Sequence, residues 1–288
     1  MLEKNCSICA SADVVIHLKK DNVGVIYRCR SCGLFYRDAS NQPKFEDPTV
    51  AIWGKKRYNI QRVEKEELQL NDYRKILPVL SCLSSEKRTV LEIGCGTGNF
   101  LKLLYNDGWD KVIGLEPSHT YSEIACQEVP AATVINTFLK DAKFTDGFFD
   151  AIIMLHVIEH IEDPAAELKV IHRVLKPTGI LVIETPRFDT IWFKLLRGRE
   201  RSIIPEHIFL FTTESLKKLL VNSGFEICRI DYVGRTLSCD RLLLNIARVA
   251  GTEKTRRWLA NLSDKYKLNK FVFYINLRDM MRVYARKL

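Results

Sequence analysis

The sequence predicts an α/β protein built on a Rossmann-like parallel sheet with helices on both faces, preceded by a small zinc-ribbon module. Three observations lead to this prediction. From residue 88 onward, short apolar runs alternate with segments of helical periodicity, which is typical of a parallel sheet covered on both sides. A glycine-rich loop follows the first of these runs. Residues 1–40 contain two closely spaced pairs of cysteines.

The apolar runs give the expected strands, and the segments between them give the helices. The expected strands are Thr89–Ile93, Lys111–Leu115, Thr133–Ile135, Phe149–Leu155, Ile180–Glu184, Phe225–Tyr232 and a final antiparallel edge strand at about Met281–Ala285. The expected helices are Asn99–Asp107, His119–Gln127, Pro164–Leu175 and Thr213–Ser223. We expect a linker with a helical segment at 41–87, and a main domain at 88–288 with a helical, basic insertion at about 236–275.

Composition excludes several classes of protein. Of the 288 residues, 47% are apolar and 27% charged, which excludes intrinsic disorder. The first residues contain no apolar stretch, and the longest apolar runs are far shorter than the ~18–20 residues of a membrane span. We therefore expect a cytoplasmic protein.

The net charge of +9 is concentrated in the C-terminal third. Residues 187–288 contain 21 Lys and Arg against 10 Asp and Glu, and the first 186 residues contain the remaining 23 against 25. Such a surface either attracts an anionic partner or is simply solvated. Within it, residues 188–201 alternate aromatic, aliphatic and cationic side chains, which indicates either a helix on a membrane surface or a lid helix. Peripheral membrane contact is one expectation.

The most informative segment is the glycine-rich loop after the first expected strand. The strand leads into Gly94, Gly96 and Gly98, and a helical segment follows directly. Glycines let the backbone approach a ligand closely, and the start of the helix offers free N–H groups. The third glycine of the dinucleotide fingerprint would fall at Asn99, which disfavours that class of site. Glu116 ends the next apolar run, where a carboxylate can accept both hydroxyls of a ribose.

Two later segments complete the pattern. The apolar run at 149–155 continues as His-Val-Ile-Glu-His, and a Leu-Lys-Pro-Thr-Gly turn at 175–179 leads into the next apolar run. With the glycine loop, these segments resemble the class I S-adenosylmethionine-dependent methyltransferases over about residues 88–232. The resemblance implies S-adenosylmethionine as cofactor, with the three glycines under its methionine part. It further implies that Glu92 binds the amino group and that Glu116 binds the ribose.

The same resemblance assigns residues to the two ends of the cofactor. Thr137 and Phe138 would border the adenine, and Leu155 and His156 would face the methyl group. The methyl is carried on a positive sulfur that becomes neutral as the methyl leaves, so alignment is most of the catalytic task. A general base is needed only when the acceptor is a hydroxyl or an acidic carbon.

Two histidine-containing segments supply the candidate catalytic residues. His156 either lines the acceptor site or packs beside it, and we interpret His160 as capping or packing against the following helix. The segment Pro205-Glu206-His207 resembles the Glu-His of sugar C-methyltransferases with N-terminal zinc modules. It is also similar to a Pro-x-His motif in methyltransferases of polysaccharide and lipid biosynthesis. The resemblance implies that His207 is a base or orients the substrate.

The spacing of the N-terminal cysteines predicts a metal site. Cys6-x-x-Cys9 and Cys29-x-x-Cys32 are separated by nineteen residues, which is typical of a four-cysteine zinc site. Four thiolates close the coordination sphere of zinc, so the ion would hold the fold and take no part in chemistry. An iron–sulfur site is the alternative.

The leading functional hypothesis is O- or C-methylation of a small-molecule, sugar or lipid-linked glycan acceptor. The alternative is an RNA methyltransferase that uses the ribbon and the basic C-terminal third to bind RNA. Nucleic acid is the less expected partner, because enzymes that methylate a base nitrogen often carry an Asn/Asp-Pro-Pro-aromatic motif after the fourth strand. Here that place is occupied by Leu155-His156-Val157-Ile158. A cofactor-sensing protein without catalytic activity is a third interpretation.

Overall fold

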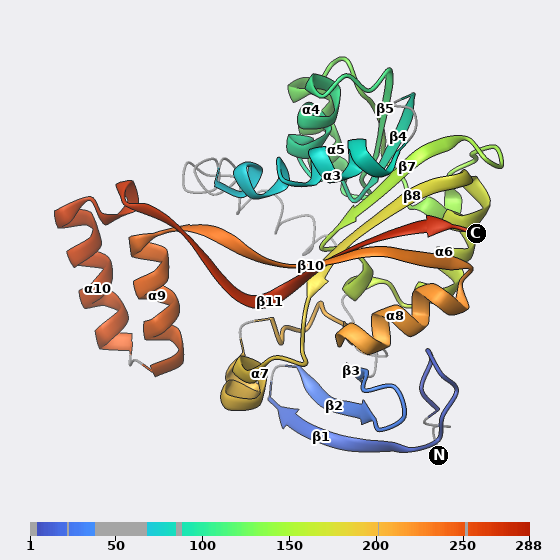
Figure 1. Ribbon diagram of the computed structural model, residues 1–288. Coiled ribbons are helices and arrows are strands. Elements are labelled where there is room, and N and C mark those ends of the chain that lie inside the picture. Colours follow the sequence, from blue (N-terminus) through green and yellow to red (C-terminus); the bar gives the residue numbers. More distant parts are fainter. Residues whose placement is uncertain (1–4, 22, 38–67, 85–87, 201, 251–252) are drawn as a thin grey trace.

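The computed structural model describes residues 5–21, 23–37, 68–84, 88–200, 202–250 and 253–288 (Figure 1). Within them, a seven-stranded sheet lies at the centre, helices cover it, and a smaller four-stranded sheet packs at one end. Most of the expected linker, residues 41–67, lies outside the described residues, as do positions 38–40 of the predicted ribbon.

The central sheet has the strand order β10-β11-β8-β7-β4-β5-β6. Five consecutive strands of this order, from β8 to β6, pair in parallel, which confirms the predicted Rossmann-like sheet. The strands are β4 (Thr89–Ile93), β5 (Lys111–Leu115), β6 (Thr133–Ile135), β7 (Phe149–Leu155), β8 (Leu175–Pro186), β10 (Phe225–Ser238) and β11 (Val272–Lys287).

The position of the last strand corrects one prediction. β11 is antiparallel, as expected, but it does not form the edge of the sheet. It lies between β8 and β10, and Tyr284 pairs with Val182 on one side and Arg229 on the other. Residues 280–285 are all buried, which suits a strand with a neighbour on each side. The half-exposed β10 takes the edge instead.

Helices cover both faces of the sheet, as predicted (Figure 1). Alternate residues of β4 explain why two layers form, because Val90 belongs to the apolar cluster on one face and Leu91 to the cluster on the other. One face carries α3 (Ile76–Leu83), α4 (Asn99–Asn106) and α5 (His119–Glu128), and the other carries α6 (Pro164–Val174) and α8 (Thr213–Asn222). Short 3-10 turns occur at η2 (Leu139–Asp141), η3 (Ile158–His160) and η4 (Arg197–Arg199).

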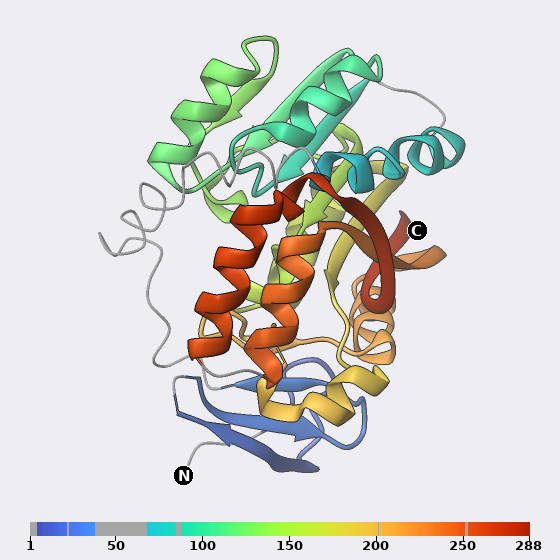
Figure 2. The same ribbon diagram turned by 90° about the vertical axis from the view of Figure 1, so that its left-hand side faces the viewer.

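Strands β10 and β11 continue beyond the sheet as a long hairpin. At its tip are α9 (Cys239–Ala250), α10 (Glu253–Tyr266) and η5 (Leu268–Lys270). Both views place α9 and α10 side by side, and Figure 1 shows them away from the central layers (Figures 1 and 2). The segment for which a helical insertion is expected, about 236–275, contains these helices and the outer part of the hairpin.

The cysteine-rich module shares a sheet with the main domain. Its strands β1 (Val14–Lys20), β2 (Gly24–Cys29) and β3 (Phe35–Arg37) are joined by β9 (Phe209–Leu210), which follows His207 in the main domain. The Arg37 side chain also donates a hydrogen bond from Nε to the His207 carbonyl at 3.1 Å. Apolar residues of both parts belong to one buried cluster. The module is therefore built into the domain next to a candidate catalytic residue.

Candidate active site and cysteine cluster

A cavity lies over the glycine loop, at the carboxyl end of β4. Four of the predicted cofactor residues line it together: Glu92, Gly94, Gly96 and Leu155. The remaining lining residues are Gln69, Leu70, Tyr73, Cys95, Thr97, Asn99 and Phe100. In open α/β sheets, ligands bind at this end of the strands.

The three glycines have backbone conformations that side chains rarely adopt, with φ of +72°, +55° and +84° at Gly94, Gly96 and Gly98. A Cβ at Gly94 would come within 2.6 Å of Val157 Cγ2, and one at Gly98 would crowd Ala125 at 3.2 Å. A Cβ at Gly96 would meet nothing within 4 Å, so the loop opens to the cavity there. The contact with Val157 also places the segment 156–160 directly against the loop.

Glu92 is a buried acid with one unsatisfied oxygen. The residue is only 4% exposed, and its Oε2 has no hydrogen-bond partner. Burial, followed by the charge of Glu116, raises the pKa of Glu92 well above its ordinary value. A buried acceptor at the wall of a cavity fits a cationic ligand group, and the ammonium of S-adenosylmethionine is such a group.

Glu116 is held in place at the end of β5. Its Oε2 accepts a hydrogen bond from Gly96 N at 2.9 Å, and its Oε1 accepts one from Ser118 N at 2.9 Å. The Asn136 side chain donates to the Glu116 carbonyl at 2.8 Å, which brings the following residues, Thr137 and Phe138, beside this strand end. Gly98, Glu116, Thr137 and Phe138 are not among the residues that line the cavity.

Helical residues 68–73 close the cavity, and the sequence did not assign them to it. Gln69, Leu70 and Tyr73 line it, and the Tyr73 ring packs edge-to-face on Phe100 with 5.7 Å between centroids. The sequence predicted a helical segment within residues 41–87, but helical periodicity alone does not tell which part of the domain a helix covers.

His156 lies between two buried carboxylates at the end of β7. Its backbone has a positive φ of 58°, and its ring nitrogens lie 3.8 Å from Glu159 Oε1 and 3.4 Å from Glu184 Oε1. Burial alone would lower the pKa of His156, but the two carboxylates raise it to about 9. The ring is therefore protonated at neutral pH, and its side chain is 35% exposed.

Glu184, on β8, also binds Arg282, on β11. The guanidinium approaches Glu184 Oε2 at 2.7 Å from Nε and at 2.6 Å from Nη2. Burial would raise the pKa of Glu184, but Arg282 and His156 lower it to about 2. Neither residue was predicted as part of the site, although one charged residue inside each of two apolar strands was a usable signal.

His160 and His207 face each other although 46 residues separate them in sequence. Their ring centroids are 4.7 Å apart, and Nδ1 of His160 is hydrogen-bonded to the Glu206 carbonyl at 2.8 Å. The interpretation of His160 as a helix cap is wrong, because Asp163 caps α6 through Ala166 N. Burial lowers the pKa of His207 to about 4, so this ring is neutral.

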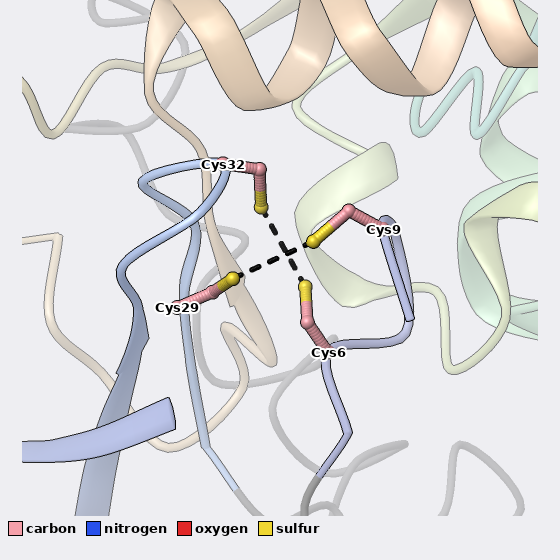
Figure 3. Close-up of side chains that lie close together, drawn as sticks. All are labelled: Cys6, Cys9, Cys29 and Cys32. Carbon is pink, nitrogen blue, oxygen red and sulfur yellow. Dashed lines mark hydrogen bonds between the residues drawn. The ribbon is translucent and has the colours of Figure 1, made fainter. Parts of the chain in front are cut away.

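The four N-terminal cysteines converge from two turns of the chain (Figure 3). Their sulfur atoms all lie within 4.8 Å of one another, with Cys6–Cys32 at 3.6 Å and Cys9–Cys29 at 3.5 Å. Four sulfurs at about 2.3 Å from one zinc ion would lie about 3.8 Å apart. The cluster therefore has the composition and size of a four-thiolate site, and these residues could hold the predicted zinc.

A model of the methyltransferase-domain family matches residues 65–230, which is more than half of the chain. The chain belongs to this family. The cavity, the glycine loop and the histidine cluster all fall within the matched segment.

Curated relatives of this methyltransferase carry two kinds of name. A probable S-adenosylmethionine-dependent methyltransferase of Mycolicibacterium smegmatis is 31% identical over 49% of this chain and 52% of that protein. A tRNA U34 carboxymethyltransferase of Alteromonas mediterranea is 26% identical over 64% of this chain and 58% of that protein. The chain thus spans about half the length of the curated relatives it matches.

Solved structures share the fold of this methyltransferase. An S-adenosylmethionine-dependent methyltransferase of Archaeoglobus fulgidus superposes with a TM-score of 0.53 at 20% identity, over 80% of this chain and 100% of that one. A protein from a complex between the Haloferax volcanii Trm112 methyltransferase activator and a methyltransferase has a TM-score of 0.58 at 14% identity, over 83% of this chain and 94% of that one.

Among the described residues, none of the helices has the length and apolar character needed to span a bilayer.

Proposed function

We propose that this protein is an S-adenosylmethionine-dependent methyltransferase that methylates an oxygen or carbon of a small-molecule, sugar or lipid-linked glycan acceptor. The observation that carries the proposal is the position of His156 and His207. His156 directly follows Leu155, which lines the cofactor cavity, and His207 lies against the same 156–160 segment through His160. Histidines beside the methyl donor suit an acceptor that must lose a proton.

The residues of the chain have distinct tasks in this proposal. The bound cofactor supplies a methyl group on a positively charged sulfur. Glu92 binds its ammonium and Glu116 its ribose, while Thr137 and Phe138 border the adenine. His156, protonated and paired with Glu159 and Glu184, offers a fixed positive charge to an anionic or polar acceptor. His207 is neutral and orients the acceptor or takes up its proton.

The four-cysteine cluster is assigned a structural zinc ion in the same proposal. The thiolate donor set and the sulfur separations of 3.5 and 3.6 Å support it. Because β3 of this module pairs with β9, the ion would stabilise the segment that carries His207. The zinc would thus act on the site only through the fold.

The lipid-linked form of the acceptor is supported by α7 (Ile191–Leu196). Phe193 is buried against Phe35 of β3, with 5.1 Å between ring centroids, and anchors the helix to the ribbon. Ile191, Trp192 and Leu195 of the same helix are exposed. Lys194 is exposed beside them, and an apolar face with cations suits the surface of an anionic membrane.

RNA methylation is the second candidate function, and one surface favours it. A hollow of about 530 Å³ between α3 and the β10–β11 hairpin is lined by the cations Lys75 and Arg278, and also by Arg229 and Arg282, which are paired with Asp231 and Glu184. Arg278 and Arg187 both lie over the Tyr232 ring, at 4.8 and 4.2 Å from its centroid. Cations around an aromatic ring can bind the phosphates and bases of RNA. Relatives named tRNA U34 carboxymethyltransferases add to this candidate.

Label transfer separates the two candidates. Purified protein, methyl-labelled S-adenosylmethionine and host extract are incubated, and the label is counted in lipid, small-molecule and RNA fractions. Label in the lipid or small-molecule fraction supports the proposal, and label in RNA overturns it. With the fraction that takes up the label as acceptor, the His207→Ala variant should lose turnover and keep its affinity for S-adenosylmethionine. Full turnover in this variant would exclude His207 from the reaction.

A further inference from the structure

Three side chains that can bind metal ions converge beside the candidate acceptor site. A carboxylate oxygen of Glu159 and one ring nitrogen from each of His160 and His207 all lie within 4.8 Å of one another. Besides the four cysteines, no other group of three or more such ligands occurs in the part of the chain that the structure describes. The composition of this group, two imidazoles and one carboxylate, is that of many open metal sites in enzymes.

Hydrogen bonds determine which nitrogen carries the proton in the His160 and His207 rings. Nδ1 of His160 lies 2.8 Å from the Glu206 carbonyl, and Nδ1 of His207 lies 2.7 Å from the Ser202 carbonyl. A carbonyl oxygen can only accept, so Nδ1 must be the donor in each ring. In a neutral ring, Nε2 then keeps a free lone pair. Histidines that bind metals are commonly oriented in this way, by donating their other N–H to a backbone carbonyl.

The carboxylate adds a third acceptor to this group. The Glu159 side chain is 1% exposed, and its Oε2 accepts a hydrogen bond from Thr185 Oγ1 at 2.9 Å. Its Oε1 has no hydrogen-bond partner, and the nearest cation, His156 Nδ1, lies 3.8 Å away. Ligand atoms of three groups therefore gather around a buried carboxylate whose Oε1 has no hydrogen bond, although the protonated His156 lies 3.8 Å from it. A cation bound among the three groups would satisfy this oxygen.

We propose that Glu159, His160 and His207 bind a divalent transition-metal ion distinct from the zinc of the cysteine cluster. Imidazole ligands favour Zn²⁺, Fe²⁺ or Co²⁺ over Mg²⁺ and Ca²⁺. Metal–ligand bonds of about 2.0–2.2 Å place ligand atoms at most about 4.4 Å apart, which is compatible with three atoms that all lie within 4.8 Å of one another. Three protein ligands leave at least one coordination position for a water molecule or an acceptor oxygen. His160 is partly exposed, which gives the ion a route of entry.

The use of the ion, but not its binding, rests on the proposed function. An acceptor hydroxyl bound to the ion would lose its proton to solvent water more readily, because the cation stabilises the oxygen anion. That oxygen forms the new bond to the methyl carbon, the bond from carbon to sulfur breaks, and the sulfonium leaves as a neutral thioether. His207 would then orient the acceptor through the ion and would not itself remove the proton.

Metal counting and titration test the proposal without knowledge of the acceptor. Protein saturated with zinc and then desalted should contain two zinc ions per chain, and His207→Ala and His160→Ala should each contain one. Co²⁺ titrated calorimetrically into protein whose cysteine cluster holds zinc should bind once, and either variant should weaken this binding by more than about 100-fold. His119→Ala, which removes an exposed imidazole on α5, is the matched control and should behave as the unaltered chain.

One zinc ion per unaltered chain, with no Co²⁺ binding at millimolar concentration, would overturn the proposal. So would two ions that persist in both histidine variants. These results require only that the variants fold, which their circular dichroism and melting temperature check. Metal binding without a methylated product would leave the site intact and contradict the proposed function. If the protein binds a single zinc ion and a chelator leaves methyl transfer unchanged, the proposed function would stand and the second metal site would be contradicted.

Discussion

Two buried glutamates near the carboxyl ends of central strands have pKa values shifted in opposite directions. Glu92, on β4, has an oxygen without a partner, and burial raises its pKa. Glu184, on β8, is bound by Arg282 and His156, which lower its pKa to about 2. A buried carboxylate without a partner is stabilised only when a cation arrives from outside. This difference supports the cofactor-binding role proposed for Glu92, whereas Glu184 already has its cation within the fold.

The comparison extends to the two ends of the candidate site. The cofactor end is built from neighbouring segments of sequence, the β4 strand, the glycine loop and the end of β5. The acceptor end brings together residues from η3, β8, β11 and the segment before β9, which are far apart in sequence.

Arg282→Met should give the largest effect, a loss of about 3 kcal/mol in the free energy of unfolding, because it leaves Glu184 buried and less well paired. Urea unfolding measures it. The double variant Glu184→Gln/Arg282→Met should recover much of the loss. A single variant as stable as the double variant would show that the ion pair is not what holds β11 against β8.

The pH dependence of the same pair has a defined sign. The pKa of Glu184 is lowered from 4.5 to about 2, so its contribution to stability is fully present above pH 4.5 and is lost as the pH falls toward 2. The stability difference between the unaltered chain and Arg282→Met should therefore shrink over this range. A constant difference would contradict the assignment.

Cys6→Ser should disturb the acceptor end and leave the cofactor end intact. The variant removes one ligand of the proposed zinc, so the cysteine-rich module would no longer fix β9, and a small displacement of His207 can reduce turnover by roughly 100-fold. Calorimetry should find the affinity for S-adenosylmethionine unchanged. Cys126→Ser, at an exposed position of α5, is the control. Equal losses of turnover and cofactor affinity would mean that the ribbon supports both ends.

Glu92→Gln should have opposite effects on binding and on stability. The variant loses a charge-assisted hydrogen bond to the cofactor ammonium, so the affinity for S-adenosylmethionine should fall by roughly 30-fold. Its stability without cofactor should not fall, because an unpaired buried acid has been removed. Glu123→Gln, an exposed change on α5, serves as the control. Loss of stability without loss of affinity would place Glu92 in the scaffold.

The smallest effect is expected at α7. Replacing both Trp192 and Leu195 by serine removes exposed apolar surface, and binding to vesicles that contain anionic lipid should weaken by about tenfold. Sedimentation with the vesicles measures it. Val221→Ser, an exposed apolar position on α8, should leave binding unchanged. Equal binding by all three proteins would remove the support for a lipid-linked acceptor.

The features that could be predicted from the sequence are those that depend on short segments of the chain. The glycine loop, the position of Glu116 at a strand end and the alternation of strands and helices along the chain depend on local patterns, so they could be predicted. The place of β11 inside the sheet, the pairing of β3 with β9 and the closure of the cavity by residues 68–73 depend on contacts between distant segments. The family resemblance brought His156 and His207 to attention, but only the fold brings His207 to His160.

The position of β11 has a consequence for the order in which the two ends form during synthesis. The segments of the cofactor end leave the ribosome more than 150 residues before Arg282 does. Strands β4, β5 and β7 can pair as soon as they emerge, whereas β8 has its second neighbour only after β11 is inserted beside it. The nascent chain therefore passes through a stage with a formed glycine loop and an open strand edge at β8. That edge is where a chaperone would protect this protein from aggregation.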